Sequence, residues 1–168
     1  DGVINVDHGY IYLPEDIEFV PGIFDLCKKF RAQGYLLIVV TNQSGIARGF
    51  YTENDFAKLT KWMVDQFAQR QCPIDDVYFC PHHAVSGIGD YKFDCDCRKP
   101  KPGMFIRAAK EHDIDFTQSV MVGDKPSDIE AANSVGITRT FFVDNYKIER
   151  EKLDNFPQVV TRLSQIIV

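Results

Sequence analysis

The sequence predicts an α/β fold in which helices cover both faces of a doubly wound parallel sheet. Strand-like and helix-like segments alternate along the 168 residues, which is the pattern of chains built from repeated β-α units. Residues 36–40 form a continuous apolar run, and such continuity is typical of a parallel strand that is buried on both faces. The length and the even composition favour one domain that spans residues 1–168.

Four helices are expected, because apolar residues recur at helical spacing between residues that start or stop helices. Glycine closes a helix at little cost because it adopts the left-handed conformation, and side-chain oxygens cap the free amides at a helix start. The signals are Pro21-Gly22 and Gly34 for the first helix, Thr52 with Asp55 for the second, Pro102-Gly103 for the third, and Ser127 with Glu130, followed by Gly136, for the fourth.

Further short strands are expected at residues 77–79, 120–122 and 140–143, and residues 159–167 indicate a closing helix or a strand followed by a helix. Polar residues follow three of the strands, at residues 41–44, in the segment that begins at Cys80, and at residues 123–125. Ligands of open parallel sheets bind at the carboxyl ends of the strands. Each group alone is also ordinary turn chemistry. Their shared placement favours a site that binds a phosphate beside a divalent cation.

The segment 80–97 carries a predicted zinc site. Its ligands would be Cys80, His82, Cys95 and Cys97, which form two pairs of donors separated by residues 83–94. Three thiolates and one imidazole make a closed tetrahedral set for Zn²⁺, and donors one residue apart can lie on the same side of a turning backbone. The alternative is two unrelated pairs of buried thiols, which the polar, glycine-containing segment between the pairs disfavours.

The composition narrows the classes of partner and compartment. With 45% hydrophobic and 26% charged residues it is that of a globular protein, and it contains no apolar run long enough to span a bilayer. A net charge of -5 argues against nucleic acid, because phosphate backbones are bound by basic faces. Cys27 and Cys72 lie outside the zinc set with no reason to pair, which fits a reducing compartment. We expect a cytoplasmic monomer without a membrane or nucleic-acid partner.

Five motifs follow one another along residues 1–136. They are D-G-x-I-N-V-D-H-G-Y from Asp1, V-V-T-N-Q-S-G-I-A-R-G from Val39, C-P-H-H from Cys80, C-D-C-R-K-P-x-P-G-M from Cys95 and V-G-D-K from Val122. Together they resemble the phosphatases of the haloacid-dehalogenase (HAD) superfamily, and within it the heptose-bisphosphate phosphatases. The resemblance implies a Rossmann-like fold with little or no cap domain, Mg²⁺ as cofactor, and a zinc loop that shapes the substrate entrance.

The family motif D-x-D-G-T places the catalytic acid at Asp1. In that motif the first Asp attacks phosphorus, and the second protonates the leaving oxygen and later activates water. Asp1 matches the second Asp, and Val3 replaces the usual Thr. We therefore expect roughly five to ten further residues, the length of a strand, ahead of Asp1. They would end in Asp-x and form a central strand, without which two helix layers would face a void.

The resemblance also assigns roles to residues at the strand ends. Those implied to be catalytic are Asp1, Thr41, Arg98 and Lys99. Those implied to bind substrate are Asp7, His8, Gly9, Tyr10, Thr41, Asn42, Gln43, Ser44, Arg98, Lys99 and Lys125. Asp1 and Asp124 are implied to hold Mg²⁺, and Lys99 to steady the transferring phosphoryl group. Asp128 reads as a helix-start acid that the helix dipole favours.

The function implied is removal of the C7 phosphate of a heptose 1,7-bisphosphate, in the synthesis of precursors of bacterial surface polysaccharide. Histidinol phosphate is the alternative substrate, because its phosphatases share the motifs. The length of residues 83–94 and the polar segment 7–10 favour the sugar, since a hydroxyl-rich ligand is selected by donors and acceptors that would otherwise stay unpaired. An alternative of another class is a zinc-stabilised binding protein that keeps the fold and lacks the nucleophile.

Overall fold

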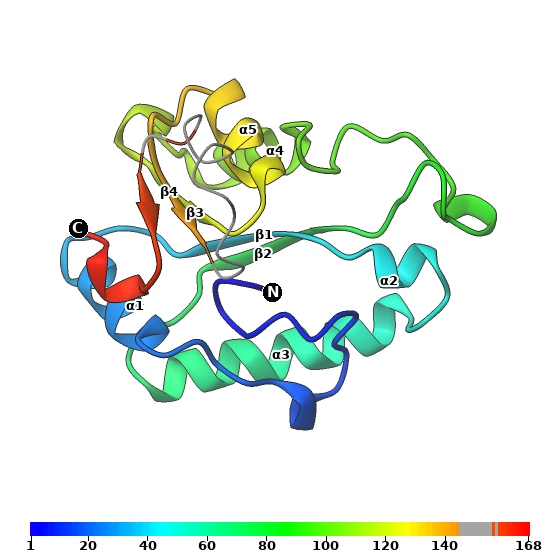
Figure 1. Cartoon of the computed structure of the whole chain (residues 1–168), viewed down its shortest axis with the longest axis horizontal. Helices are drawn as coiled ribbons and strands as arrows, with labels where there is room; N and C mark the ends of the chain where they lie inside the picture. Colours follow the sequence, from blue (N-terminus) through cyan, green and yellow to red (C-terminus); the bar gives the residue numbers. More distant parts are fainter. Residues whose placement is uncertain (145–155, 157) are drawn as a thin grey trace.

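The computed structural model describes residues 1–144, 156 and 158–168, and Figure 1 shows their arrangement. The helices are α1 (Ile23–Ala32), α2 (Ser44–Ala47), α3 (Glu53–Gln69), α4 (Gly103–His112) and α5 (Pro126–Ser134). The strands are β1 (Ile38–Asn42), β2 (Asp76–Cys80), β3 (Val120–Gly123), β4 (Arg139–Val143) and β5 (Val159–Val160). Short 3-10 turns lie at Pro14–Asp16, Gly89–Tyr91, Phe116–Gln118 and Leu163–Gln165.

The named strands pair in parallel, as the sequence predicts. β1 lies beside β2, with Thr41 opposite Phe79, and a second sheet has the order β3-β4-β5. The expected single sheet is therefore divided into two within the described residues. A cavity of about 670 Å³ lies between the two sheets; both β1 and β3 line it, and its polar end reaches Asp1, Lys99 and Asp124.

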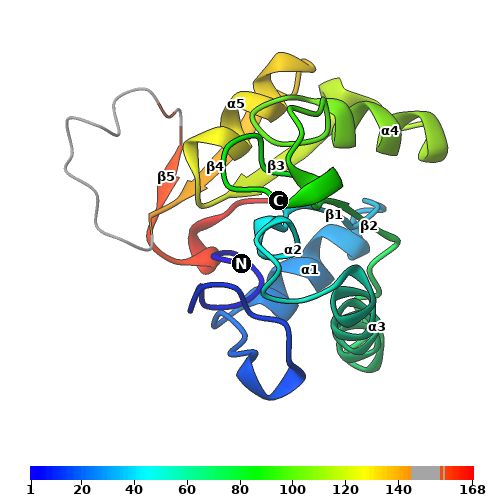
Figure 2. The same ribbon diagram turned by 90° about the vertical axis from the view of Figure 1, so that its right-hand side faces the viewer.

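Alternate residues of the strands pack against different helices. One set, which includes Val39 and Phe141, joins a core with residues of α1 and α3, and Phe67 is fully buried there. The other set, which includes Val40 and Phe142, packs against α4 and α5. Figures 1 and 2 show these two pairs of helices on opposite sides of the strands. This is the layering of a doubly wound α/β fold.

The end of α1 is fixed by Gly34. Its φ is 84°, and the amides of Gly34 and Tyr35 donate to the carbonyls of Arg31 and Phe30 respectively. These two bonds form a Schellman cap, and the Phe30 and Tyr35 rings meet with centroids 5.2 Å apart, as such caps favour. The cap turns the chain towards β1, and the predicted helix end is confirmed.

β1 differs from its prediction in length and burial. It begins at Ile38 instead of residue 36, and Leu36 is 46% exposed. The strand is half-buried along its length, although helices cover both of its faces as expected. The physical reason is that β1 borders the cavity instead of another strand on one side. α2 forms directly after β1 and is not among the four expected helices.

The start of α5 also differs from its prediction. The amide of Lys125 donates to Asp128 Oδ2 at 3.0 Å, so Asp128 caps the helix and the expected box of Ser127 with Glu130 is wrong. The end of the chain takes one of its two expected forms, a short strand, β5, followed by the 3-10 turn Leu163–Gln165.

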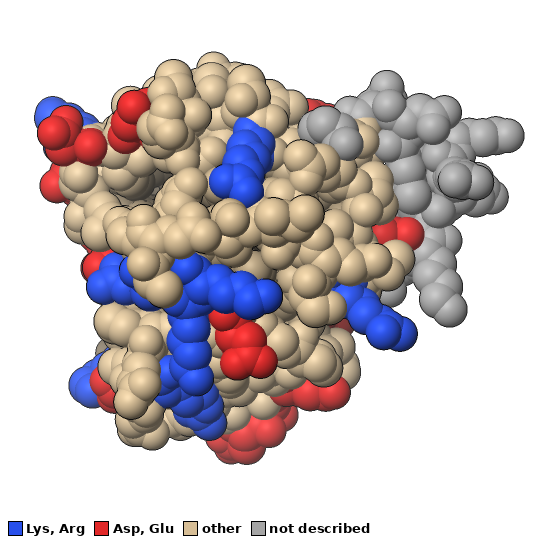
Figure 3. Space-filling view, turned by 90° about the vertical axis from the view of Figure 1, so that its left-hand side faces the viewer, with Lys and Arg blue, Asp and Glu red and all other residues tan. Residues whose placement is uncertain are grey.

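The outer surface carries charges of both signs. Figure 3 shows one face on which Lys and Arg side chains form a band with Asp and Glu side chains beside it. None of the helices in the described ranges is long and apolar enough to cross a membrane.

Candidate active site and metal centre

Lys99 lies at the polar end of the cavity. Its side chain is 7% exposed, and its Nζ donates to the Val40 carbonyl at 2.7 Å and lies 2.7 Å from Asp128 Oδ1. A buried ammonium group is tolerated only when it is paired and hydrogen-bonded. These two contacts fix the lysine beside β1, where its charge can act on a phosphoryl oxygen.

The side chain of Asn42 fixes the backbone of Lys99. Its Nδ2 donates to the Lys99 carbonyl and its Oδ1 accepts from the Lys99 amide, both at 3.1 Å. The pair of bonds joins the last residue of β1 to the segment that follows the zinc loop. Asn42, expected to bind substrate, thus uses both polar ends of its side chain to position Lys99.

A chain of hydrogen bonds sets the direction of the Thr41 hydroxyl. Gln43 is buried; its Nε2 donates to Thr41 Oγ1 at 2.9 Å, and its Oε1 accepts from the Tyr51 hydroxyl at 2.5 Å. Because Thr41 Oγ1 accepts there, its own proton is free to bond elsewhere. Gly45 makes room, since a Cβ at that position would lie 2.1 Å from the Tyr51 ring. Gln43 therefore lies behind Thr41, and Ser44 follows half-buried as the first residue of α2.

Asp124 follows β3 and lines the cavity with a buried carboxylate. Its Oδ2 is buried and has no hydrogen-bond partner among the described residues. Gly2 packs so closely that a Cβ there would lie 2.0 Å from Oδ2. Burial raises the pKa of Asp124, and the neighbouring charge of Asp128 raises it further. A cation would satisfy this oxygen, so the carboxylate fits a Mg²⁺ ligand.

Asp1, Asp7 and Lys125 surround Asp124. Asp1 and Lys125 line the same end of the cavity as Asp124, and the charges of Asp7 and Lys125 act on the Asp124 carboxylate. The Asp1 side chain is exposed, and its Oδ1 accepts from Asn5 Nδ2 at 2.9 Å. Lys125 Nζ lies 3.1 Å from Asp7 Oδ2. Burial alone would raise the pKa of Asp7, but the hydrogen bond and charge of Lys125 hold it below its usual value.

Residues 7–10 form a rim in which Asp7 is half-buried and residues 8–10 are exposed. Asp7 Oδ1 accepts from the Gly9 amide at 3.0 Å, and positive φ angles at Gly9 and Tyr10 turn the chain. Tyr10 meets Phe50 edge-on with ring centroids 4.7 Å apart. His8 is exposed, and its Nε2 lies 3.2 Å from a glutamate carboxylate. Of the four residues implied to contact a sugar, Asp7 reaches the Asp124 group through Lys125.

Two arginines lie between this rim and the zinc loop. Arg98 is half-buried and its Nη1 donates to the His82 carbonyl at 3.1 Å. Arg48 directly follows α2, and its guanidinium carbon lies 5.8 Å from the centroid of the Tyr10 ring. Burial lowers the pKa of His83, and so do the charges of Arg98 and then Arg48. Arg98, the expected substrate contact, therefore has a second cation nearby that sequence reasoning missed.

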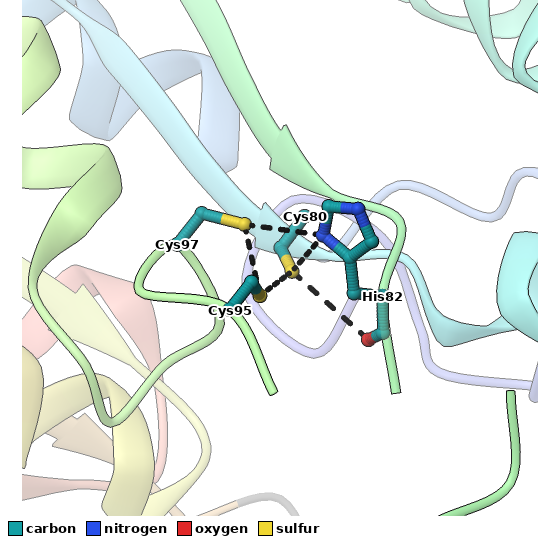
Figure 4. Close-up of side chains that lie close together, drawn as sticks. All are labelled: Cys80, His82, Cys95 and Cys97. Carbon is teal, nitrogen blue, oxygen red and sulfur yellow. Dashed lines mark hydrogen bonds between the residues drawn. The ribbon is translucent and has the colours of Figure 1, made fainter. Parts of the chain in front are cut away.

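The four predicted zinc ligands point toward one another (Figure 4). The ligand atoms of Cys80, His82, Cys95 and Cys97 all lie within 4.8 Å of one another. The Sγ atoms of Cys80 and Cys95 are 3.4 Å apart, and those of Cys95 and Cys97 are 3.1 Å apart. These distances are too long for disulfides and suit ligands that share one tetrahedral ion. Burial raises the pKa of the Cys80 thiol, which a bound cation would offset, so the donor set fits Zn²⁺.

Asp128 is the main site residue that sequence reasoning missed. It caps α5 as a helix-start acid should, but its other oxygen holds Lys99. Its place as the third residue of a helix that begins beside Asp124 is the signal that could have found it. Tyr51 gave no comparable signal, because its role depends on the buried position of Gln43.

The chain is similar to known phosphatases along most of its length. The sequence profile of the HAD-hydrolase-like family matches residues 96–165. The D-glycero-beta-D-manno-heptose-1,7-bisphosphate 7-phosphatase of Vibrio cholerae is 49% identical over 160 residues, which cover 95% of this chain and 86% of that protein. The D-glycero-alpha-D-manno-heptose-1,7-bisphosphate 7-phosphatase of Burkholderia mallei is 50% identical over 143 residues, which cover 85% of this chain and 76% of that protein.

The fold is similar to that of a solved relative. The crystal structure of D,D-heptose 1,7-bisphosphate phosphatase from B. bronchiseptica, complexed with magnesium and phosphate, has a TM-score of 0.80 to this chain at 28% identity. The match covers 98% of this chain and 90% of that one. The chain therefore belongs to the D-glycero-D-manno-heptose-1,7-bisphosphate 7-phosphatase family of the HAD superfamily.

Proposed function

We propose that the protein is a Mg²⁺-dependent phosphatase that removes the C7 phosphate of D-glycero-D-manno-heptose 1,7-bisphosphate and leaves the C1 phosphate in place. The observation that carries the proposal is the polar end of the cavity, where Thr41, Lys99 and Asp124 come together in a chain 49% identical to a 7-phosphatase. A fixed cation, an available hydroxyl and an unpaired carboxylate can bind a phosphoryl group beside a metal ion.

The protein's own groups carry both halves of this reaction. An aspartate two residues before Asp1 attacks phosphorus, and Asp1 gives a proton to the leaving sugar oxygen. Asp1 then takes a proton from the water that hydrolyses the aspartyl-phosphate. Lys99 and the Thr41 hydroxyl hold the phosphoryl oxygens in both steps. Asp124 and Asp1 would hold Mg²⁺, which when bound neutralises charge on the phosphoryl group.

We propose that this nucleophilic aspartate ends a strand that fills the cavity between β1 and β3. Among the described residues, neither strand has a strand neighbour on the side of the cavity. Away from the site the wall is apolar, with Phe30, Val39 and Met121 in it. A parallel strand would satisfy the open backbone groups of both edges. Its carboxyl end would then lie beside Lys99.

We propose a structural role for Zn²⁺ at the four ligands of the zinc loop. Four protein ligands leave no open position for water or substrate. Arg98 and Lys99 directly follow the last ligand, Cys97. A bound ion would therefore hold the loop that positions both cations, and its loss would act on the reaction indirectly.

We place the enzyme in the cytoplasm, as a monomer that supplies heptose precursors for bacterial surface polysaccharide. The five cysteines are all free thiols, which suits a reducing compartment.

The test is a comparison of kcat/KM for the α and β heptose 1,7-bisphosphates and histidinol phosphate, with Mg²⁺ and the full-length protein. We expect one of the sugars to exceed histidinol phosphate by more than tenfold, about 1.4 kcal/mol of transition-state preference. The reverse preference would overturn the heptose assignment and leave a phosphatase. Absence of Mg²⁺-dependent hydrolysis of all three would favour the non-catalytic zinc-stabilised binding protein.

A further inference from the structure

Lys99 lies in a turn that closes onto the zinc ligands. The Gly103 amide, at the end of the turn, donates to the Asp96 carbonyl at 2.9 Å. Asp96 stands between the ligands Cys95 and Cys97 in the sequence. The two ends of the turn are packed so closely that a Cβ at Gly103 would lie 2.4 Å from the Asp96 carbonyl oxygen. A movement of these metal ligands would therefore move the backbone that carries Lys99.

The first zinc ligand, Cys80, is tied to the other phosphate-binding segment. It is the last residue of β2 and lies opposite Asn42 of β1 in the parallel register. Its carbonyl accepts from the Gln43 amide at 2.8 Å, and the Gln43 side chain donates to Thr41 Oγ1. One residue, Gln43, thus connects a metal ligand to the hydroxyl that is expected to hold a phosphoryl oxygen.

The side chain of Asn42 joins these two attachments. It donates to the Lys99 carbonyl and accepts from the Lys99 amide, both at 3.1 Å, across 57 positions of sequence. Two hydrogen bonds from one planar amide group fix both the position and the direction of the backbone that they bind. The turn that carries Lys99 is therefore held at its base by the metal-binding hairpin and at Lys99 itself by the end of β1.

Two ligands that order the same segment strengthen each other's binding, because the second finds part of the ordering already done. Occupation of the four zinc ligands would hold the hairpin at the base of the turn. A phosphate between Thr41 and Lys99 would hold the same turn from the side of β1. The effect of one site on the other then depends on the hydrogen bonds that join the turn to the strand, which are those of Asn42.

We propose that Asn42 is a positioning residue that couples the metal centre to the phosphate site, so that zinc and phosphate each strengthen the binding of the other. The inference rests on the proposed function, which puts the phosphate at Thr41 and Lys99. It replaces the substrate contact that the resemblance implies for the Asn42 side chain, since both polar ends of that side chain bond Lys99. An enzyme occupied by phosphate would then keep its zinc at lower concentrations of the free ion.

The test measures the apparent dissociation constant of zinc by competition with a chelator, on the full-length protein with Mg²⁺, without and with saturating orthophosphate. We expect phosphate to lower this constant at least about fivefold in the unmodified protein. In Asn42→Ala the ratio of the two constants should fall below about twofold. Asn42→Asp should behave likewise, because it keeps an acceptor for the Lys99 amide but sets a second oxygen against the Lys99 carbonyl. Asn133→Ala is the matched control; it removes an exposed amide from α5 and should keep the full ratio.

The ratio separates a positioning role from a loss of stability. A variant that only weakens the fold raises both zinc constants by the same factor and leaves their ratio unchanged. Calorimetric titration sets the orthophosphate concentration that saturates each variant.

An undiminished ratio in Asn42→Ala would overturn the role of Asn42, and a zinc constant of the unmodified protein that does not respond to bound phosphate would overturn the coupling itself. Failure of the unmodified enzyme to hydrolyse heptose 1,7-bisphosphate, with the ratio intact, would overturn the proposed function alone. The two failures are therefore distinguishable.

Discussion

Loss of the Asp128 carboxylate would leave the Lys99 ammonium buried with a single carbonyl partner. The ion pair is 2.7 Å long and both side chains are 7% exposed. Removing one partner of a buried pair costs about 3–5 kcal/mol, and losing the cap on the Lys125 amide costs about 1 kcal/mol more. We therefore expect Asp128→Ala to lower the free energy of unfolding by about 4–6 kcal/mol.

The matched control is a second ion pair of the same length at the surface. Lys61 Nζ lies 2.7 Å from Asp65 Oδ2, but the side chains are 78% and 50% exposed. Lys61→Ala should lower the free energy of unfolding by no more than about 0.5 kcal/mol, because solvent screens an exposed ion pair. Urea denaturation followed by circular dichroism measures the stability of both variants. The expected difference in unfolding free energy corresponds to urea midpoints about 2 M apart at ordinary denaturant slopes.

Asp128→Asn separates the charge from the cap. It keeps an acceptor for the helix amide, so its loss of stability should be smaller, while kcat/KM should still fall at least about tenfold because Lys99 loses the group that positions it. The reasoning is refuted if the loss of unfolding free energy in Asp128→Ala exceeds that in Lys61→Ala by no more than about 1 kcal/mol. A difference that small would mean that the buried pair contributes no more than a surface ion pair.

Three further predictions concern the two metal sites and the orientation of the Thr41 hydroxyl. Cys95→Ser should release zinc, lower the melting temperature and reduce activity, as metal analysis and calorimetry would reveal; full activity with unchanged stability would show that the loop does not need the ion. Asp124→Asn should abolish activity with zinc retained, and should raise stability in metal-free buffer by about 1–3 kcal/mol at pH values above the raised pKa of Asp124. This gain should shrink as the pH falls through the raised pKa of Asp124 and vanish below the ordinary value of 3.8, where the carboxylate is protonated in both folded and unfolded states. A gain independent of pH would contradict the assignment. Tyr51→Phe should loosen the bonds that orient Thr41 and lower kcat/KM several-fold, whereas Tyr91→Phe, whose hydroxyl bonds an exposed glutamate at 2.8 Å, should not; equal effects would argue against the positioning role.

Much of the fold follows from local sequence signals. Helical spacing, together with Gly34 and Thr52, located the helices, because these residues cap the chain through bonds within a few residues of themselves. The apolar run at 36–40 predicted β1, but it did not predict that the strand is only half-buried. Burial depends on what lies beside the strand, and on one side of β1 that is a cavity.

The candidate site was predictable where it depends on strand ends and not where it depends on packing. Parallel strands bring their carboxyl ends to one edge, so Thr41, Lys99 and Asp124 could be expected together. The partner of Lys99 could not, because Asp128 reads as a helix cap until the tertiary fold places it 2.7 Å away. Arg48 gave no signal in sequence either, since its place over the Tyr10 ring becomes visible only in the tertiary fold.

The most direct test of the central claim is the identity of the product, followed by ³¹P NMR as the full-length enzyme acts on heptose 1,7-bisphosphate with Mg²⁺. The phosphoryl group to be removed is the one expected to reach Thr41, Lys99 and Asp124 at the polar end of the cavity. We predict one equivalent of orthophosphate and accumulation of heptose 1-phosphate. Accumulation of heptose 7-phosphate, or loss of both phosphates at similar rates, would contradict the assignment of the site.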